Sequence, residues 1–191
     1  MNTTLLTDQE RSSLLRLARE SIQAAVAGRP LPKFPEGEIT EALRTPGASF
    51  VTLTIGGMLR GCIGALEAYQ PLVDDVQEHA AAAALEDYRF HPVSSHEVPD
   101  LEIEISRLTP PLRLDYSDAD DLMHRLRPGI DGVILRDGMR RATFLPQVWE
   151  KIPDAADFLS ELCAKMGARF DLWRTRKLEV FVYQVEEFHE A

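Results

Sequence analysis

The amino-acid sequence predicts an α+β fold, with a mainly antiparallel sheet and packed helices. Two glycine-containing turns, Gly56-Gly57 and Asp137-Gly138, each separate two runs of strand character, which is the usual signal of a β-hairpin. Helical and strand-like segments do not alternate strictly, as they would in a parallel α/β sheet. The chain has 191 residues, of which 45% are hydrophobic and 27% charged, which is typical of a globular domain.

The first helix begins at a capping box. In Thr7-Asp8-Gln9-Glu10 a hydroxyl and a carboxylate can each accept from a backbone N–H at the helix start. Apolar residues follow at helical spacing, and Gly28 followed by Pro30 ends the helix. The proline-rich stretch 30–37 predicts an extended segment before a short helix over 39–43.

The first hairpin predicts a specific register. Residues 51–55 alternate as a strand, the glycine pair forms a two-residue loop, and residues 58–64 return. The resulting pairs are Ile55 with Met58, Leu53 with Arg60, and Val51 with Cys62. In this register Arg60 and Cys62 share one face of the sheet.

The rest of the chain supplies helices and strands in irregular order. Gln70-Pro71 predicts the start of a helix with an alanine-rich buried face, and 101–105 alternates as a strand. The Asp137-Gly138 turn joins a second hairpin. The further predictions are helices over 118–126 and 154–166, hairpin strands over 132–136 and 139–145, and a well-covered strand over 178–185.

Charge and motif spacing exclude several classes of function. The formal net charge of −10 argues against a nucleic-acid partner. No apolar run is long enough for a transmembrane helix, and the first ten residues lack the pattern of a signal peptide. We therefore expect a cytoplasmic protein with two free cysteines. The five histidines show no metal-binding spacing, and no cofactor or oligomeric state is indicated.

Three ordered motifs carry a family resemblance. They are Leu59-Arg60-Gly61-Cys62-Ile63-Gly64, Asp87-Tyr88-Arg89-Phe90-His91-Pro92 and Thr143-Phe144-Leu145-Pro146-Gln147-Val148. With them the chain resembles the AMMECR domain family, whose bacterial members are called AmmeMemoRadiSam system protein A. The chain departs from the family's pattern at Tyr88, where proline is usual, at His91, where proline is frequent, and at Met166, where alanine is usual.

The resemblance implies a single domain over residues 1–191, made of two unequal α+β parts with a cleft. We expect the smaller part within about residues 65–130. The resemblance also implies a system that contains a Memo-like protein and a radical SAM protein. It implies no particular reaction.

Cys62 is the candidate nucleophile. A neighbouring Arg60 cation and the backbone N–H groups beside Gly61 and Gly64 would favour its thiolate form. Alternatively, Cys62 is a small apolar core residue and its glycines allow close packing.

The candidate ligand-binding residues also have two interpretations each. Arg60 either clamps a carboxylate or phosphate, or bridges a buried carboxylate such as Glu67 or Glu102. Arg89 and His91 follow the alanine-rich helix, where a loop can project them into a cleft.

His91 is a candidate base for Cys62, while Asp87 and Arg89 are also placed to form a simple salt bridge. Gln147 either presents its amide to a ligand or stabilises a turn.

These residues lead to two hypotheses. The first is a cysteine-centred enzyme, or enzyme-system component, that binds a small anionic ligand in a cleft and works with Memo-like and radical SAM proteins. The alternative is a non-catalytic adaptor or carrier module for the same partner proteins.

Overall fold

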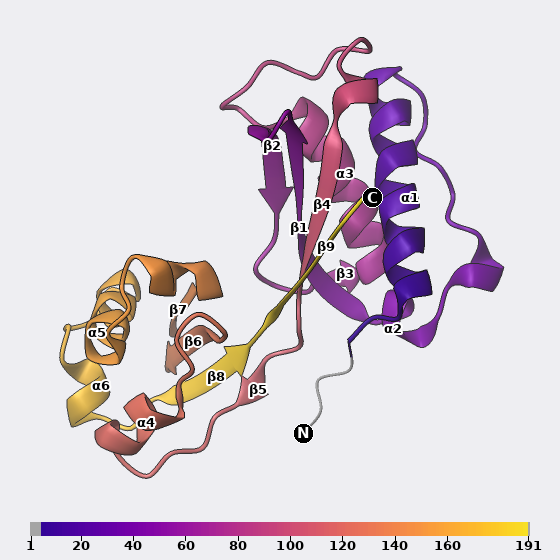
Figure 1. Ribbon diagram of the computed structural model, residues 1–191. Helices are drawn as coiled ribbons and strands as arrows, with labels where there is room; N and C mark the ends of the chain where they lie inside the picture. The colour runs from indigo at the N-terminus through magenta and orange to yellow at the C-terminus, as the bar shows by residue number, and fades with distance from the viewer. Residues whose placement is uncertain (1–4, 191) are drawn as a thin grey trace. The chain divides into compact units, whose positions relative to one another are not determined.

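The computed structural model describes residues 5–190, which divide into two compact units (Figure 1). The first unit extends to Thr109 and resumes at Glu186, and the second comprises Pro110–Val185. Both units combine helices with an antiparallel sheet, so the predicted α+β fold class is confirmed. The second unit overlaps the expected range 65–130 only from residue 110 onward.

The first unit is built on a five-stranded sheet in the order β2-β1-β4-β9, with β3 also paired to β1. Strand β1 is the centre, because it pairs antiparallel with β2, β3 and β4. The strands are β1 (Pro46–Ile55), β2 (Met58–Gly64), β3 (Gln70–Pro71), β4 (Glu102–Leu108) and β9 (Val185–His189).

Helices α1 and α3 pack on each other and against this sheet, where they enclose the first hydrophobic core. Alternate residues of β1, Val51 and Leu53, are fully buried in that core. The helical segments are α1 (Asp8–Val26), α2 (Glu41–Arg44), α3 (Leu72–Leu85) and the 3₁₀ turns η1 (Glu36–Glu38) and η2 (Val98–Asp100).

The predicted helix start at Thr7 is confirmed. The Thr7 hydroxyl accepts from the Glu10 N–H at 3.2 Å, and the Glu10 carboxylate accepts from the Thr7 N–H at 2.7 Å. Helix α3 starts one residue later than predicted, since Pro71 is its N-cap and ends strand β3.

The β1–β2 hairpin confirms the predicted loop but not the predicted register. Gly56 and Gly57 have positive φ angles, 56° and 76°, as the two-residue loop requires. A β-bulge then interrupts the ladder after Leu53, so that Arg60 is the extra residue on β2. The observed pairs are Ile55 with Met58, Thr54 with Leu59, Leu53 with Gly61, Thr52 with Cys62, and Val51 with Ile63.

Close packing between β2 and α3 explains this register. A Cβ atom at Gly61 would lie 2.1 Å from the backbone oxygen of Ala83 in α3. Only a glycine fits at this position, and the bulge brings Gly61 there in place of Arg60. The prediction that Arg60 pairs with Leu53 and Cys62 with Val51 was therefore wrong.

The second unit has a four-stranded sheet in the order β5-β8-β6-β7 and its own hydrophobic core. Phe158, Leu162 and Cys163 of α5 are fully buried in that core. The elements are β5 (Leu112–Arg113), α4 (Ala119–Arg125), β6 (Gly132–Asp137), β7 (Arg140–Phe144), η3 (Pro146–Glu150), α5 (Ala155–Lys165), α6 (Leu172–Thr175) and β8 (Glu179–Tyr183).

Two predictions for this unit need correction. The second hairpin turns at Gly138-Met139 rather than Asp137-Gly138, because Asp137 pairs with Arg140 and Gly138 has the positive φ of 61°. The strand predicted over 178–185 is broken at Gln184, where the chain leaves β8 of one sheet and begins β9 of the other.

Within residues 5–190, no helix is long and apolar enough to cross a membrane. The same residues contain no cluster of three or more side chains suited to hold a metal ion.

Candidate functional site

The loop that follows α3 forms hydrogen bonds with the backbone of Cys62 at the free edge of β2. Strand β2 ends the sheet order, so one of its edges has no neighbouring strand. The Cys62 N–H donates to Asp87 Oδ2 at 2.8 Å, and the Cys62 carbonyl accepts from Arg89 Nη2 at 3.3 Å. Asp87 and Arg89 therefore take the place of a strand partner at this position.

Asp87 and Arg89 form a two-pronged ion pair. Arg89 Nε donates to Asp87 Oδ1 at 2.9 Å and Nη2 donates to Oδ2 at 2.6 Å. The Asp87 side chain is buried, and its hydrogen bonds from Arg89 hold its pKa far below the usual range despite desolvation. The same pair raises the pKa of Arg89, so both groups stay charged at neutral pH.

Arg60 forms hydrogen bonds with the C-terminal part of the same loop. Its Nε donates to Glu97 Oε1 at 2.7 Å and its Nη2 donates to Oε2 at 3.2 Å, while Nη1 donates to the His91 carbonyl at 2.9 Å. Nη2 also reaches the Pro92 carbonyl at 3.4 Å. Hydrogen bonds from Arg60 and then from Ser94 lower the pKa of Glu97 to about 2.

The carboxylate that pairs with Arg60 is thus Glu97, which is one-third exposed, and neither of the two acids considered from the sequence. Nothing in the local sequence links positions 60 and 97. The bulge at Arg60 is what releases its side chain from the sheet ladder toward the loop.

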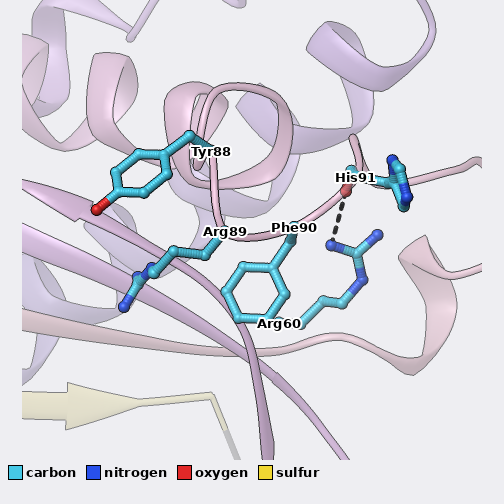
Figure 2. A pocket seen from close by; sticks show the side chains of 5 residues that line it. All are labelled: Arg60, Tyr88, Arg89, Phe90 and His91. Atoms are coloured by element: carbon cyan, nitrogen blue, oxygen red, sulfur yellow. Dashed lines mark hydrogen bonds between the residues drawn. The ribbon is translucent and has the colours of Figure 1, made fainter.

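An open pocket of about 440 Å³ lies over this loop (Figure 2). Its lining contains two guanidinium groups, an imidazole and two aromatic rings, and no carboxylate: Arg60, Tyr88, Arg89, Phe90 and His91. All of them belong to the first unit. In Figure 2 the Phe90 ring lies between the side chains of Arg89 and Arg60, and the Arg89 guanidinium is 5.5 Å from its centroid.

Both arginines keep N–H groups for which the described residues provide no acceptor. A guanidinium has five N–H donors. Arg89 uses its Nε and Nη2 hydrogens on Asp87 and Cys62, and within residues 5–190 no acceptor is found for the two hydrogens of its Nη1. Arg60 uses four donors in the same part of the chain and keeps one on Nη1. Arg89 is therefore the more available anion ligand.

Cys62 lies next to this pocket but does not line it. Because Gly61 faces α3, strand alternation directs Cys62 to the opposite face of the sheet. Its side chain is half-buried there and outside both hydrophobic cores. Thr52, its partner across the strands, donates from Oγ1 to Cys62 Sγ at 3.3 Å.

A row of polar side chains crosses this face at Cys62. Thr52 pairs with Cys62 on one side and with Glu104 on the other. In the part of the chain that the structure describes, the half-buried Glu104 carboxylate has no hydrogen-bond or ion-pair partner. Thr52 and Glu104 were missed from the sequence because the wrong register placed Val51, not Thr52, beside Cys62.

The other candidate residues do not all converge on the pocket. His91 is exposed and lines it, but among the described residues no hydrogen bond joins His91 to Cys62. Gln147 is exposed on η3 in the second unit. Gly64 is needed for packing, since its Cβ would meet the Phe50 ring and the Ser49 oxygen at 2.4 Å.

The second cysteine is structural. Cys163 is fully buried in α5, and burial raises the pKa of its thiol.

Comparison with known proteins covers nearly the whole chain. The family model AMMECR1 matches residues 15–188. A protein of Methanothermobacter thermautotrophicus is 36% identical over 97% of this chain and 96% of its own length, and protein NEQ441 of Nanoarchaeum equitans is 33% identical over 93% and 99%. The crystal structure of the uncharacterized protein PH0010 from Pyrococcus horikoshii superposes with a TM-score of 0.75 at 31% identity, covering 97% of this chain and 93% of that one. The chain belongs to the AMMECR1 family.

Proposed function

We propose that this protein is a cysteine-centred enzyme, or a component of an enzyme system, that binds a small anionic ligand in the pocket formed by Arg60 and residues 88–91. One observation carries the proposal. The pocket lining includes guanidinium N–H groups that have no acceptor among the described residues, and it contains no carboxylate, although the whole chain has a net charge of −10. Such donors recognise carboxylate and phosphate oxygens.

The two arginines have different roles in this proposal. Arg89 presents both hydrogens of Nη1 to the ligand, while Asp87 holds the rest of its guanidinium in place. Arg60 contributes one N–H and mainly holds the loop through Glu97 and the His91 carbonyl. A ligand therefore meets a cation that is already oriented, which lowers the entropic cost of binding.

Cys62 is the proposed nucleophile or covalent acceptor. The hydroxyl of Thr52 donates to its sulfur and so helps to hold the side chain in one position. Arg89 contacts the backbone carbonyl of Cys62 and also lines the pocket, so the proposed nucleophile lies next to the anion site. His91 is the auxiliary acid or base of the pocket.

Alkylation of the native protein with iodoacetamide tests the nucleophile. We expect iodoacetamide to label Cys62 in the folded protein at neutral pH, since its side chain is only half-buried. Cys163 is an internal control because it is fully buried and must label only after unfolding. Labelling of Cys62 that also requires denaturation rejects the role.

Titration with inorganic phosphate, followed by NMR, tests the anion site. We expect shifts at residues 88–91 that the substitution Arg89→Gln abolishes. Arg113→Gln, which removes an exposed arginine of the second unit, is the matched control and must leave the shifts unchanged.

Family membership supports the proposal that the protein works with a Memo-like protein and a radical SAM protein. We also propose a cytoplasmic location, because both cysteines are free thiols and such thiols persist in a reducing compartment.

The alternative is a non-catalytic adaptor or carrier for these partners. The exposure of Tyr88 and Met58, 95% and 73%, favours it, since such side chains are common in protein interfaces. An adaptor must co-purify with its partner after Cys62→Ala and lose the partner when Tyr88 and Met58 are both replaced by serine.

A further inference from the structure

The aromatic side chains of the pocket narrow the class of ligand, and this inference rests on the anion site proposed above. Tyr88 is 95% exposed, so its ring contributes almost nothing to the hydrophobic core. Phe90, two residues later, is half-buried, and its ring forms part of the pocket wall beside Arg89. Two aromatic rings and two arginines are thus concentrated within one open pocket (Figure 2).

The backbone that carries these rings is held at several points. The Phe90 N–H donates to the Asp87 carbonyl at 3.0 Å, and the Val93 N–H donates to the Ala84 carbonyl at 2.8 Å. The Arg89 N–H donates to Asp87 Oδ1 at 3.2 Å, and Arg60 binds the His91 carbonyl. The exposed Tyr88 ring therefore projects from a loop whose backbone is fixed by several hydrogen bonds.

The rings and the free donors can serve one ligand at the same time. The N–H hydrogens that have no acceptor among the described residues are on Nη1 of Arg89 and Nη1 of Arg60. Figure 2 shows these two side chains on the two sides of the Phe90 ring. An anionic group bound at Nη1 of Arg89 keeps its substituent close to Phe90, whose ring centroid is 5.5 Å from that guanidinium, and to Tyr88, the residue before Arg89. Aromatic side chains prefer aromatic partners in stacked or edge-to-face geometry, and guanidinium groups stack on ring faces.

We infer that the ligand is an aromatic anion, in which a flat ring carries a carboxylate or a phosphate. The anionic group is bound by Arg89, and the ring packs against Tyr88 and Phe90. The pocket of about 440 Å³ is in the range of about 300–1,000 Å³ that small-molecule sites occupy. Tyr88 is the residue that selects the ring, and Arg89 is the residue that selects the charge.

A matched set of small probes tests the inference by NMR titration. Benzoate and cyclohexanecarboxylate share the carboxylate and differ in the aromatic ring, whereas benzamide keeps the ring and lacks the charge. We expect benzoate to bind about three- to tenfold more tightly than cyclohexanecarboxylate, and benzamide to show no saturable shift. Phenyl phosphate compared with benzoate identifies which anionic group the site prefers.

Two variants test the contribution of the Tyr88 ring. Tyr88→Leu keeps an apolar side chain at an exposed position and must reduce the preference for benzoate, because only Phe90 then remains to contact the ring, while the affinity for cyclohexanecarboxylate stays unchanged. Tyr69→Leu, at another exposed tyrosine of the first unit, must leave both affinities unchanged.

The outcomes distinguish this inference from the proposal on which it rests. If both carboxylates bind equally well and both require Arg89, the aromatic preference is wrong and the anion site stands. If no anion produces shifts that depend on Arg89, the anion site and the aromatic preference both fail.

Discussion

The Asp87 carboxylate accepts a hydrogen bond from the backbone N–H of Cys62 at 2.8 Å, and this bond attaches the loop after α3 to the edge of β2. The same carboxylate holds Arg89, whose guanidinium returns a hydrogen bond to the Cys62 carbonyl. The buried Asp87 thus positions both the strand that carries Cys62 and the guanidinium of Arg89, which is proposed to bind the anion.

We expect Asp87→Ala to lower the free energy of unfolding by about 2–4 kcal/mol, because it leaves the Cys62 N–H without an acceptor and Arg89 without its partner. Urea denaturation measures this loss. Asp171→Ala is the control, since Asp171 pairs with Arg169 at the same sequence spacing but both side chains are exposed. That variant should cost less than about 1 kcal/mol, and equal losses in the two variants would contradict the role of Asp87.

The Arg60–Glu97 pair predicts a loss of stability in acid. The folded-state pKa of Glu97 is about 2, below its ordinary value of 4.5, so the pair stabilises the native protein fully above pH 4.5 and loses its contribution as pH falls toward 2. Glu97→Gln should therefore destabilise the protein at pH 6 and have progressively less effect between pH 4.5 and 2. Urea denaturation of both proteins across this pH range measures the difference in free energy of unfolding. A difference that stays constant with pH would rule out the proposed coupling between Glu97 protonation and stability.

Substitution of Gly61 tests the packing that determines the register. Gly61→Ala places a Cβ 2.1 Å from the Ala83 backbone oxygen, which neither β2 nor α3 can accommodate without moving. We expect a cost of about 3 kcal/mol in the free energy of unfolding. Gly37→Ala is the control, because no atom lies within 4 Å of its added Cβ and its φ is ordinary. It should change stability by less than about 1 kcal/mol.

The Thr52 hydroxyl is expected to promote the reactivity of Cys62. Thr52→Val preserves shape and removes the O–H that donates to Sγ, so we expect alkylation of Cys62 at pH 7 to slow about fivefold, the effect of losing a hydrogen bond of about 1 kcal/mol. Iodoacetamide kinetics measure the rate. Thr54→Val, on the same strand, removes a hydroxyl that donates to Glu102 and should leave the rate unchanged. An unchanged rate in Thr52→Val would show that this hydrogen bond does not tune the thiol.

Local signals in the sequence were sufficient to predict where most helices start and where most turns lie. Thr7, Asp118 and Asp154 each cap a helix where the sequence predicts a helix to start, because a cap needs only the three residues that follow it. The Gly56-Gly57 loop was correct for the same reason. The Gly138-Met139 turn was missed by one residue, since Asp137-Gly138 and Gly138-Met139 both satisfy a two-residue turn that has a glycine.

The sequence by itself determined the α+β class, the elements around Cys62 and the family to which the chain belongs. Only the tertiary structure decided which residues surround the thiol, because the bulge at Arg60 depends on contact between Gly61 and a helix carbonyl 22 positions along the chain. That one-residue shift exchanges the faces of the strand. It pairs Cys62 with Thr52, sends Arg60 to Glu97, and leaves Arg89 as the cation beside the thiol's backbone.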